Sequence, residues 1–193
     1  MLAKARGFTL MELVITLVLL SIVLVPMVGL LVDQSRKALD PVQEVRASQL
    51  AQRLFNQMLS RAYDQNSDLN GSRWRCGEVL NGVTYPTCTA SAGYGPDSGE
   101  TRAYLFNDVD DFDTAAICNK GLTSCDSGNW VRASFFTQDS SGEASEYAGF
   151  SVHIAVTAVV GCAANCAQAK HVLLQIRLPA GGTLPFAFER GNY

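Results

Sequence analysis

Residues 13–32 form a run of 20 residues that contains no charged side chain. An α-helix of about 20 residues, rising ~1.5 Å per residue, spans the ~30 Å hydrocarbon core of a bilayer. A secretory signal peptide would have a shorter apolar core followed by a cleavage site of small residues, whereas this run leads into the polar residues 33–37. The run therefore predicts a single membrane-spanning helix, with Lys4 and Arg6 holding the N-terminus on the cytoplasmic side.

A single carboxylate, Glu12, stands at the start of this apolar run, after Phe8-Thr9-Leu10-Met11. Moving a charged side chain into hydrocarbon costs about 2.5–3.5 kcal/mol, so we expect Glu12 to have a partner. If the chain is cut after Gly7, Phe8 gains a free α-amino group four residues from Glu12. The two groups then lie one turn apart within a helix, and they can pair more directly between two staggered, parallel copies.

The sequence Arg-Gly-Phe-Thr-Leu-Met-Glu at residues 6–12, followed by an apolar helix, resembles the prepilin N-terminus of type IV pilins and type II secretion pseudopilins. The resemblance implies cleavage between Gly7 and Phe8 by a membrane prepilin peptidase, and N-methylation of Phe8. It also implies polymerisation through the helix, with Glu12 neutralising the amino terminus of a neighbouring subunit. The implied organisation is a leader at 1–7, a transmembrane and filament-core helix at 8–32, and a globular domain at 33–193.

Further patches of sequence are similar to minor pilins of the mannose-sensitive haemagglutinin (MSHA) pilus system; these are residues 40–42, 45–47, 75–78, 99–102 and 106–112. This likeness implies a structural subunit that is anchored in the inner membrane with a periplasmic domain, and is then built into a surface filament for attachment. Two alternatives stay open: a minor pseudopilin of type II secretion, and a tip adhesin or ligand-binding module. The adhesin hypothesis would use residues 64–99 and the acidic segment near residue 110 as its surfaces.

Residues 33–62 continue the helical pattern, because apolar residues recur at steps of three and four from Ala47 to Ala62. This stripe should pack on a sheet. Pro41 lies inside the segment, so either the helix bends there or a second helix begins with Asp40 as its cap. Residues 64–99 are rich in turn-forming residues and predict a long excursion stapled by a disulfide.

Strands are expected in the C-terminal half of the chain. Alternating apolar residues predict strands over 148–160 and 170–178, joined as a hairpin through residues 161–169. Shorter candidates are 102–106, 130–136 and an edge strand at 184–188, where Pro185 limits pairing. The expected fold class is α+β: a pilin-like fold with a long N-terminal helix on a mainly antiparallel sheet.

The six cysteines all lie in the C-terminal two-thirds of the chain, at Cys76, Cys88, Cys118, Cys125, Cys162 and Cys166. An even number of cysteines in loop-like sequence is typical of disulfides formed in an oxidising compartment. Pairing of neighbours (76–88, 118–125, 162–166) is the simplest interpretation, because short loops are easy to close. A zinc site is the alternative, although the chain contains no C-x-x-C motif.

An acidic segment offers oxygen ligands at Asn107, Asp108, Asp110, Asp111 and Asp113. Carboxylates at alternate positions of a loop suit Ca²⁺, although the glycine and the glutamate of an EF-hand loop are missing. The competing interpretation is a solvated acidic loop between strands. Calcium is the one cofactor that the sequence suggests.

The sequence gives little support for catalysis or for nucleic-acid binding. His153 and His171 fall on predicted strands, no G-x-S-x-G motif occurs, and no glycine-rich phosphate loop is present. Lys and Arg number 15 against 18 Asp and Glu, giving a net charge of −3, so there is no basic surplus for nucleic acid. We therefore expect a chain that is not an enzyme, whose partners are other pilin subunits, the prepilin peptidase and the inner membrane.

Overall fold

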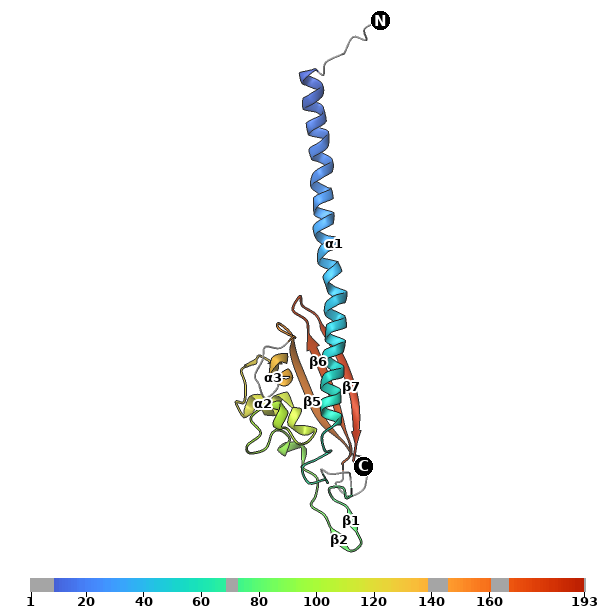
Figure 1. Ribbon diagram of the computed structural model, residues 1–193, viewed down its shortest axis with the longest axis vertical. Helices are drawn as coiled ribbons and strands as arrows, with labels where there is room; N and C mark the ends of the chain where they lie inside the picture. Colours follow the sequence, from blue (N-terminus) through green and yellow to red (C-terminus); the bar gives the residue numbers. More distant parts are fainter. Residues whose placement is uncertain (1–8, 69–72, 139–145, 161–166, 193) are drawn as a thin grey trace. The chain divides into compact units, whose positions relative to one another are not determined.

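The computed structural model describes residues 9–68, 73–138, 146–160 and 167–192 (Figure 1). The chain divides into two compact units, residues 1–42 and residues 43–193. The predicted leader and Phe8 lie outside the described residues, as do Cys162 and Cys166.

Helix α1 runs without interruption from Leu10 to Leu59 and contains both Pro26 and Pro41. The predicted continuation of the helix beyond residue 32 is confirmed. A separate second helix capped by Asp40 is not what the structure has. Proline inside a helix removes one backbone hydrogen bond and crowds the preceding turn, and α1 nevertheless continues through residue 41.

The second half of α1 supplies one face of the core of the unit 43–193. Five of its predicted stripe residues are buried, namely Ala47, Leu50, Ala51, Leu54 and Met58. Phe55 packs edge-to-face against Phe186 and Phe188, with ring centroids 6.4 and 4.8 Å away. These two rings belong to strand β7, so the expected packing of the stripe on a sheet is confirmed.

A five-stranded antiparallel sheet forms the other layer, in the order β3-β4-β5-β6-β7 (Figure 1). The strands are β3 (Cys125–Asp126), β4 (Trp130–Arg132), β5 (Ser151–Val160), β6 (Ala167–Arg177) and β7 (Thr183–Gly191). β5 and β6 pair as the predicted hairpin, with Ile154 opposite Leu174. β7 is an edge strand, and Pro185 lies opposite Gln175 of β6. The predicted α+β class is therefore confirmed.

One of the shorter strand predictions was wrong, and another was right only in part. Residues 102–106 contain a 3-10 turn, η2 (Ala103–Leu105), and the segment 130–136 is a strand only as far as Arg132, after which α3 (Ala133–Thr137) begins. Where these segments are not strands, they contain buried residues three positions apart: Ala103 with Phe106, and Ala133 with Phe136. That spacing puts them on one face of a helical turn and on opposite faces of a strand.

The segment between α1 and the sheet is built from short elements. It contains the hairpin β1 (Val79–Leu80) and β2 (Val83–Thr84), the 3-10 turns η1 (Ser91–Gly93) and η3 (Asp110–Phe112), and helix α2 (Thr114–Asn119). Asn81 and Gly82 both have positive φ, at 51° and 78°. This is the two-residue primed turn that Asn-Gly favours, because its twist matches that of the paired strands.

Candidate functional site

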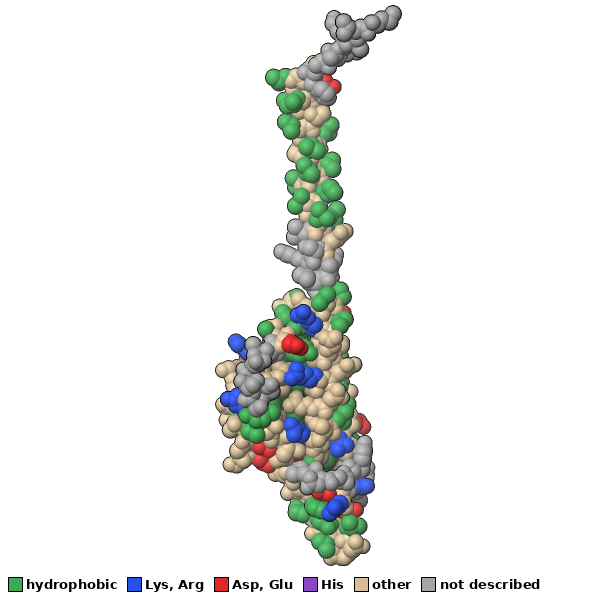
Figure 2. All heavy atoms as spheres, in the orientation of Figure 1, with side chains coloured by type: hydrophobic (Ala, Val, Ile, Leu, Met, Phe, Trp, Pro, Cys, Tyr) green, Lys and Arg blue, Asp and Glu red, His purple; other side chains and the backbone are tan. Residues whose placement is uncertain are grey.

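The first candidate site is the apolar part of α1, residues 10–31, whose length and composition suit a membrane span. Figure 2 shows hydrophobic side chains along the visible face of this part of the helix. Leu10 is 83% exposed and Val25 is 73% exposed in the single chain. A helix that is apolar on all sides needs lipid or other helices around it. By length and composition, this part of α1 suits a membrane anchor.

The start of this helix is capped by Thr9. The backbone N–H of Glu12 donates to the carbonyl oxygen of Thr9 at 3.1 Å and to its hydroxyl oxygen at 3.3 Å. Thr9 and Glu12 thus have the S/T-x-x-E spacing of a capping box. A carboxylate in the first turn also interacts favourably with the positive end of the helix dipole. Part of the cost of Glu12 in an apolar segment is therefore offset within its own chain.

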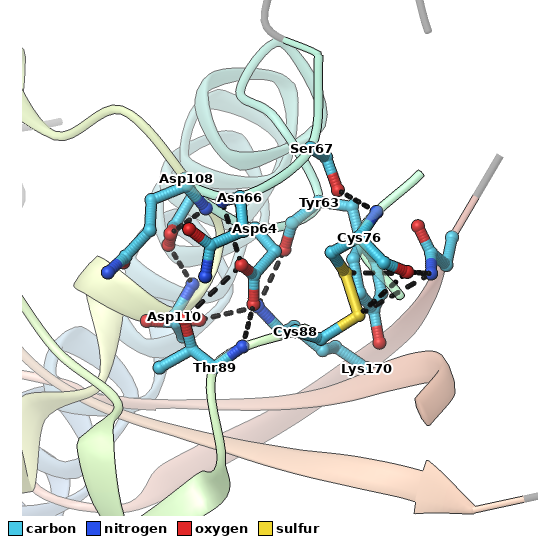
Figure 3. Close-up of polar contacts among 12 residues, drawn as sticks. Tyr63, Asp64, Asn66, Ser67, Cys76, Cys88, Thr89, Asp108, Asp110 and Lys170 are labelled. Atoms are coloured by element: carbon cyan, nitrogen blue, oxygen red, sulfur yellow. Dashed lines mark hydrogen bonds and ion pairs between the residues drawn. A yellow bond between two sulfur atoms is a disulfide. The ribbon is translucent and has the colours of Figure 1, made fainter. Parts of the chain in front are cut away.

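The second candidate site is a buried charge cluster centred on Lys170 (Figure 3). Its ammonium Nζ lies 2.5 Å from Oδ2 of Asp110 and 3.5 Å from Oδ2 of Asp64, and all three side chains are fully buried. Nζ also donates to the carbonyl oxygen of Tyr63 at 2.6 Å. The rings of Tyr63 and Tyr94 lie 4.6 and 5.0 Å from it.

Three elements bring this cluster together. Lys170 is on β6 and has the same parity as the buried Val172 and Leu174, so its side chain enters the core rather than the solvent. Asp64 follows the end of α1, and Asp110 begins η3. One lysine therefore ties the end of the long helix and η3 to the sheet.

Backbone and side-chain donors complete the coordination of both carboxylates. Asp64 accepts from the N–H groups of Thr89 at 2.8 Å and Asn66 at 2.9 Å. Asp110 accepts from the N–H of Gly95 at 3.2 Å. Burial raises the pKa of Asp110, although the neighbouring Lys170 opposes that rise. The arrangement is a desolvated ion pair with few free lone pairs.

The acidic segment is not a solvated loop, which corrects one of the two interpretations of the sequence. Asp108 and Asp111 are buried, and burial raises their pKa to about 8 and about 7, respectively. Asp108 Oδ1 accepts from the N–H of Asp110, and Asp111 Oδ2 accepts from the N–H of Asn107. The carboxylates fold the segment by satisfying its backbone donors, which is why they lie inside.

The predicted calcium ligands therefore have different surroundings. Asp113 is the N-cap of α2, accepting from Ala115 and Ala116, and Asp110 is paired with Lys170. Asp108, Asp110 and Asp111 each present an oxygen within 4.8 Å of the others. Among the described residues, Oδ1 of Asn107 and Oδ1 of Asp111 are buried without a hydrogen-bond partner. Calcium binding stays a prediction.

Two disulfides, Cys76–Cys88 and Cys118–Cys125, agree with pairing of neighbouring cysteines. The third predicted pair, Cys162 with Cys166, lies outside the described residues. Within the part of the chain that the structure describes, the zinc alternative is wrong for those four cysteines, because their thiols are bonded to each other.

The histidines have ordinary surroundings. His153 lies against the ring of Trp130, with ring centroids 5.7 Å apart. His171 lies 3.7 Å from Glu189 on the neighbouring strand, and both side chains are exposed. The contacts of His153 and His171 are therefore with Trp130 and Glu189 rather than with the Lys170 cluster.

Sequence reasoning missed Lys170, Asp64 and Thr9. A signal for Lys170 existed, because it occupies an inward position of a strand whose other inward residues are apolar. Thr9 was also detectable, since it stands three residues before Glu12. Asp64 carried no signal, because only the tertiary fold brings it to Lys170.

Comparison with protein families matches residues 2–28 to the prokaryotic N-terminal methylation motif. Neither the curated proteins nor the solved structures give a match to this chain. The matched residues include the predicted cleavage site, Glu12 and most of the apolar helix. The chain therefore carries the N-terminus of a type IV pilin-like prepilin.

Proposed function

We propose that this chain is a minor pilin of a type IV pilus of the MSHA type, resembling MshD, and that it acts as a structural subunit rather than as an enzyme. The methylation motif at residues 2–28 carries the prepilin part of the proposal, and the MSHA part rests on the sequence likeness at residues 40–42, 45–47, 75–78, 99–102 and 106–112. The exposed apolar helix at residues 10–31, which overlaps the motif, supports a filament subunit, since such a surface suits first a membrane and then a bundle of like helices.

In this proposal the prepilin peptidase cleaves between Gly7 and Phe8, and the new amino group of Phe8 is N-methylated. Glu12 of one subunit then pairs with the Phe8 amine of the next as the helices leave the bilayer. Burying either charge alone is costly, and pairing the two removes both unpaired charges together. The globular unit stands in the periplasm before assembly and on the filament surface afterwards.

The first experiment is N-terminal sequencing and mass measurement of the protein from cells with and without the prepilin peptidase. We expect a mature chain that begins at methylated Phe8 only where the peptidase is present. A chain that keeps residues 1–7 in peptidase-containing cells would refute the proposed processing.

The second experiment tests the pairing with Glu12→Val. We expect this variant to insert in the membrane and to accumulate there, because its hydrophobicity increases, and to be incorporated poorly into filaments. Glu44→Val is the matched control, since Glu44 is exposed and lies beyond the apolar segment. Equal incorporation of both variants would contradict the charge pairing.

Copurification with pilus proteins rather than with secretion-system proteins separates the minor pilin from a type II minor pseudopilin.

A recognition role is a second candidate function, and the β1–β2 hairpin favours it. Val79 is 65% exposed and Val83 is 53% exposed at this hairpin, which lies within the predicted 64–99 surface. Asp108, Asp110 and Asp111 are buried and drop out of that surface. We expect Val79→Ser with Val83→Ser to reduce attachment while leaving piliation intact, if the hairpin contacts a ligand. Unchanged attachment would refute this role.

A further inference from the structure

Lys170 is a buried primary amine that the proposed function does not use. Its Nζ lies 2.5 Å from Oδ2 of Asp110, an oxygen bonded directly to the carboxyl carbon Cγ. A second carboxylate, Asp64, lies 3.5 Å from the same nitrogen. All three side chains have no exposed surface. An amine, a carboxyl group and a proton-transferring acid thus meet in a site without solvent access.

We propose that Lys170 and Asp110 condense to an intramolecular isopeptide bond, with Asp64 as the proton-transfer group. The fold itself brings together the two reacting residues and the proton-transfer group (Figure 3). The reaction needs no cofactor, oxidant or second substrate.

The condensation conserves atoms and charge and releases one water molecule. A proton passes from the Lys170 ammonium to Oδ2 of Asp110, giving a neutral amine and a carboxylic acid. The nitrogen lone pair attacks Cγ, and Asp64 accepts a second proton from the nitrogen. Asp64 then gives this proton to the Oδ2 hydroxyl, which leaves as one water molecule. Oδ1 becomes the amide oxygen, one hydrogen remains on the amide nitrogen, and Asp64 returns to its starting state.

The surroundings suit each step. The N–H of Gly95 donates to Oδ1 of Asp110, the oxygen on which negative charge develops during the attack. The carbonyl oxygen of Tyr63 holds Nζ at 2.6 Å. Backbone N–H groups of Asn66 and Thr89 fix the Asp64 carboxylate. Because the reactants are held in contact, the reaction is unimolecular, and the product water is released from a dry site.

The starting state also favours the condensation. Asp110 and Lys170 are in direct contact, and neither side chain has exposed surface. Forming the amide removes two desolvated charges from the interior, and these are costly to keep. The bond joins β6 to η3 covalently and, unlike the two disulfides, it survives reduction.

The test is the intact mass of the full-length protein, purified in detergent and fully reduced and alkylated. We expect a mass lower than that of the linear chain by one water, about 18 Da. Digestion should release a branched peptide that contains both Lys170 and Asp110, with Lys170 protected from trypsin. A folded protein that shows the full mass of the linear chain, or a loss of water located at another residue, would overturn the proposal.

Two variants assign the roles, and each is read by mass. Lys170→Arg removes the nucleophile and should restore the full mass. Asp64→Asn keeps Lys170 and Asp110 in place but removes the proton acceptor, so it should also show the full mass. Lys120→Arg is the matched control, because Lys120 contacts the carbonyl oxygens of Gly95 and Pro96 and should keep the mass loss. A cross-link that persists in Asp64→Asn would refute the role of Asp64. The filament proposal stands or falls separately, since it depends on residues 7–32.

Discussion

Replacing Lys170 by methionine should destabilise the globular unit more than any surface substitution would. Methionine fills most of the volume of the lysine side chain, so the main change is the loss of the ammonium group. Asp110 and Asp64 would remain buried with their negative charges uncompensated. The variant leaves these carboxylates unpaired whether or not Lys170 and Asp110 have condensed in the wild type. Removing one partner of a buried ion pair costs about 3–5 kcal/mol.

The expected shift in unfolding temperature follows from the size of the unit. For a unit of about 150 residues, 1 kcal/mol corresponds to roughly 2–4 °C, so Lys170→Met should lower Tm by about 10 °C. Near-UV circular dichroism of the detergent-solubilised full chain measures this change. Lys120→Met is the comparison, because Lys120 contacts two backbone carbonyl oxygens and should cost about 1 kcal/mol.

A double variant tests the electrostatic cause. In Lys170→Met with Asp110→Asn, the uncompensated charge on residue 110 disappears, while Asp64 keeps its hydrogen bonds from Thr89 and Asn66. About half of the lost stability should therefore return. A loss below about 1 kcal/mol in the single variant, or no recovery in the double variant, would refute the view that this buried pair requires its lysine.

Three further predictions follow from the acidic segment and its surroundings. Because burial raises the folded pKa of Asp108 to about 8 and of Asp111 to about 7, their stabilising contribution is present below about pH 4 and is lost as pH rises through these values. Urea unfolding in EDTA should show a falling free energy of unfolding from pH 5 to pH 8, with a smaller slope in Asp111→Asn; an unchanged slope would contradict this assignment. Millimolar Ca²⁺ at pH 8 should raise Tm of the wild type but not of Asp111→Asn, and the absence of binding heat in calorimetry would dismiss the calcium site. Gly95→Ala should lower Tm severely, because φ at Gly95 is +111° and an added Cβ would lie 2.2 Å from Cβ of Ala116; a shift of only a few degrees would show that this turn can relax.

The periodic elements were predictable from the sequence, because their burial follows their own repeat. The stripe from Ala47 to Met58 on α1 and the alternation on β5 and β6 were each visible locally. The primed turn at Asn81 and Gly82 was also readable, although the hairpin around it was not predicted.

One candidate site could be predicted from local sequence, and the other could not. Thr9 and Glu12 lie in one helical turn, so the N-terminal site is contained in a short segment of sequence. The Lys170 cluster depends on residues 60 and 106 positions apart, and no local pattern reports such a meeting. For the same reason, the acidic segment could be recognised by composition but its burial could not, since burial depends on which backbone N–H groups its carboxylates accept.

Strand β7, at one edge of the sheet, has features that protect against aggregation when many copies of the chain are concentrated. Pro185 removes one donor from its backbone, and Glu189 and Arg190 place charge along the strand. Such irregular, charged margins discourage sheets of different molecules from fusing side by side. Neighbouring copies at high concentration would then keep their sheets separate at this edge, which protects the globular unit against amyloid-like growth.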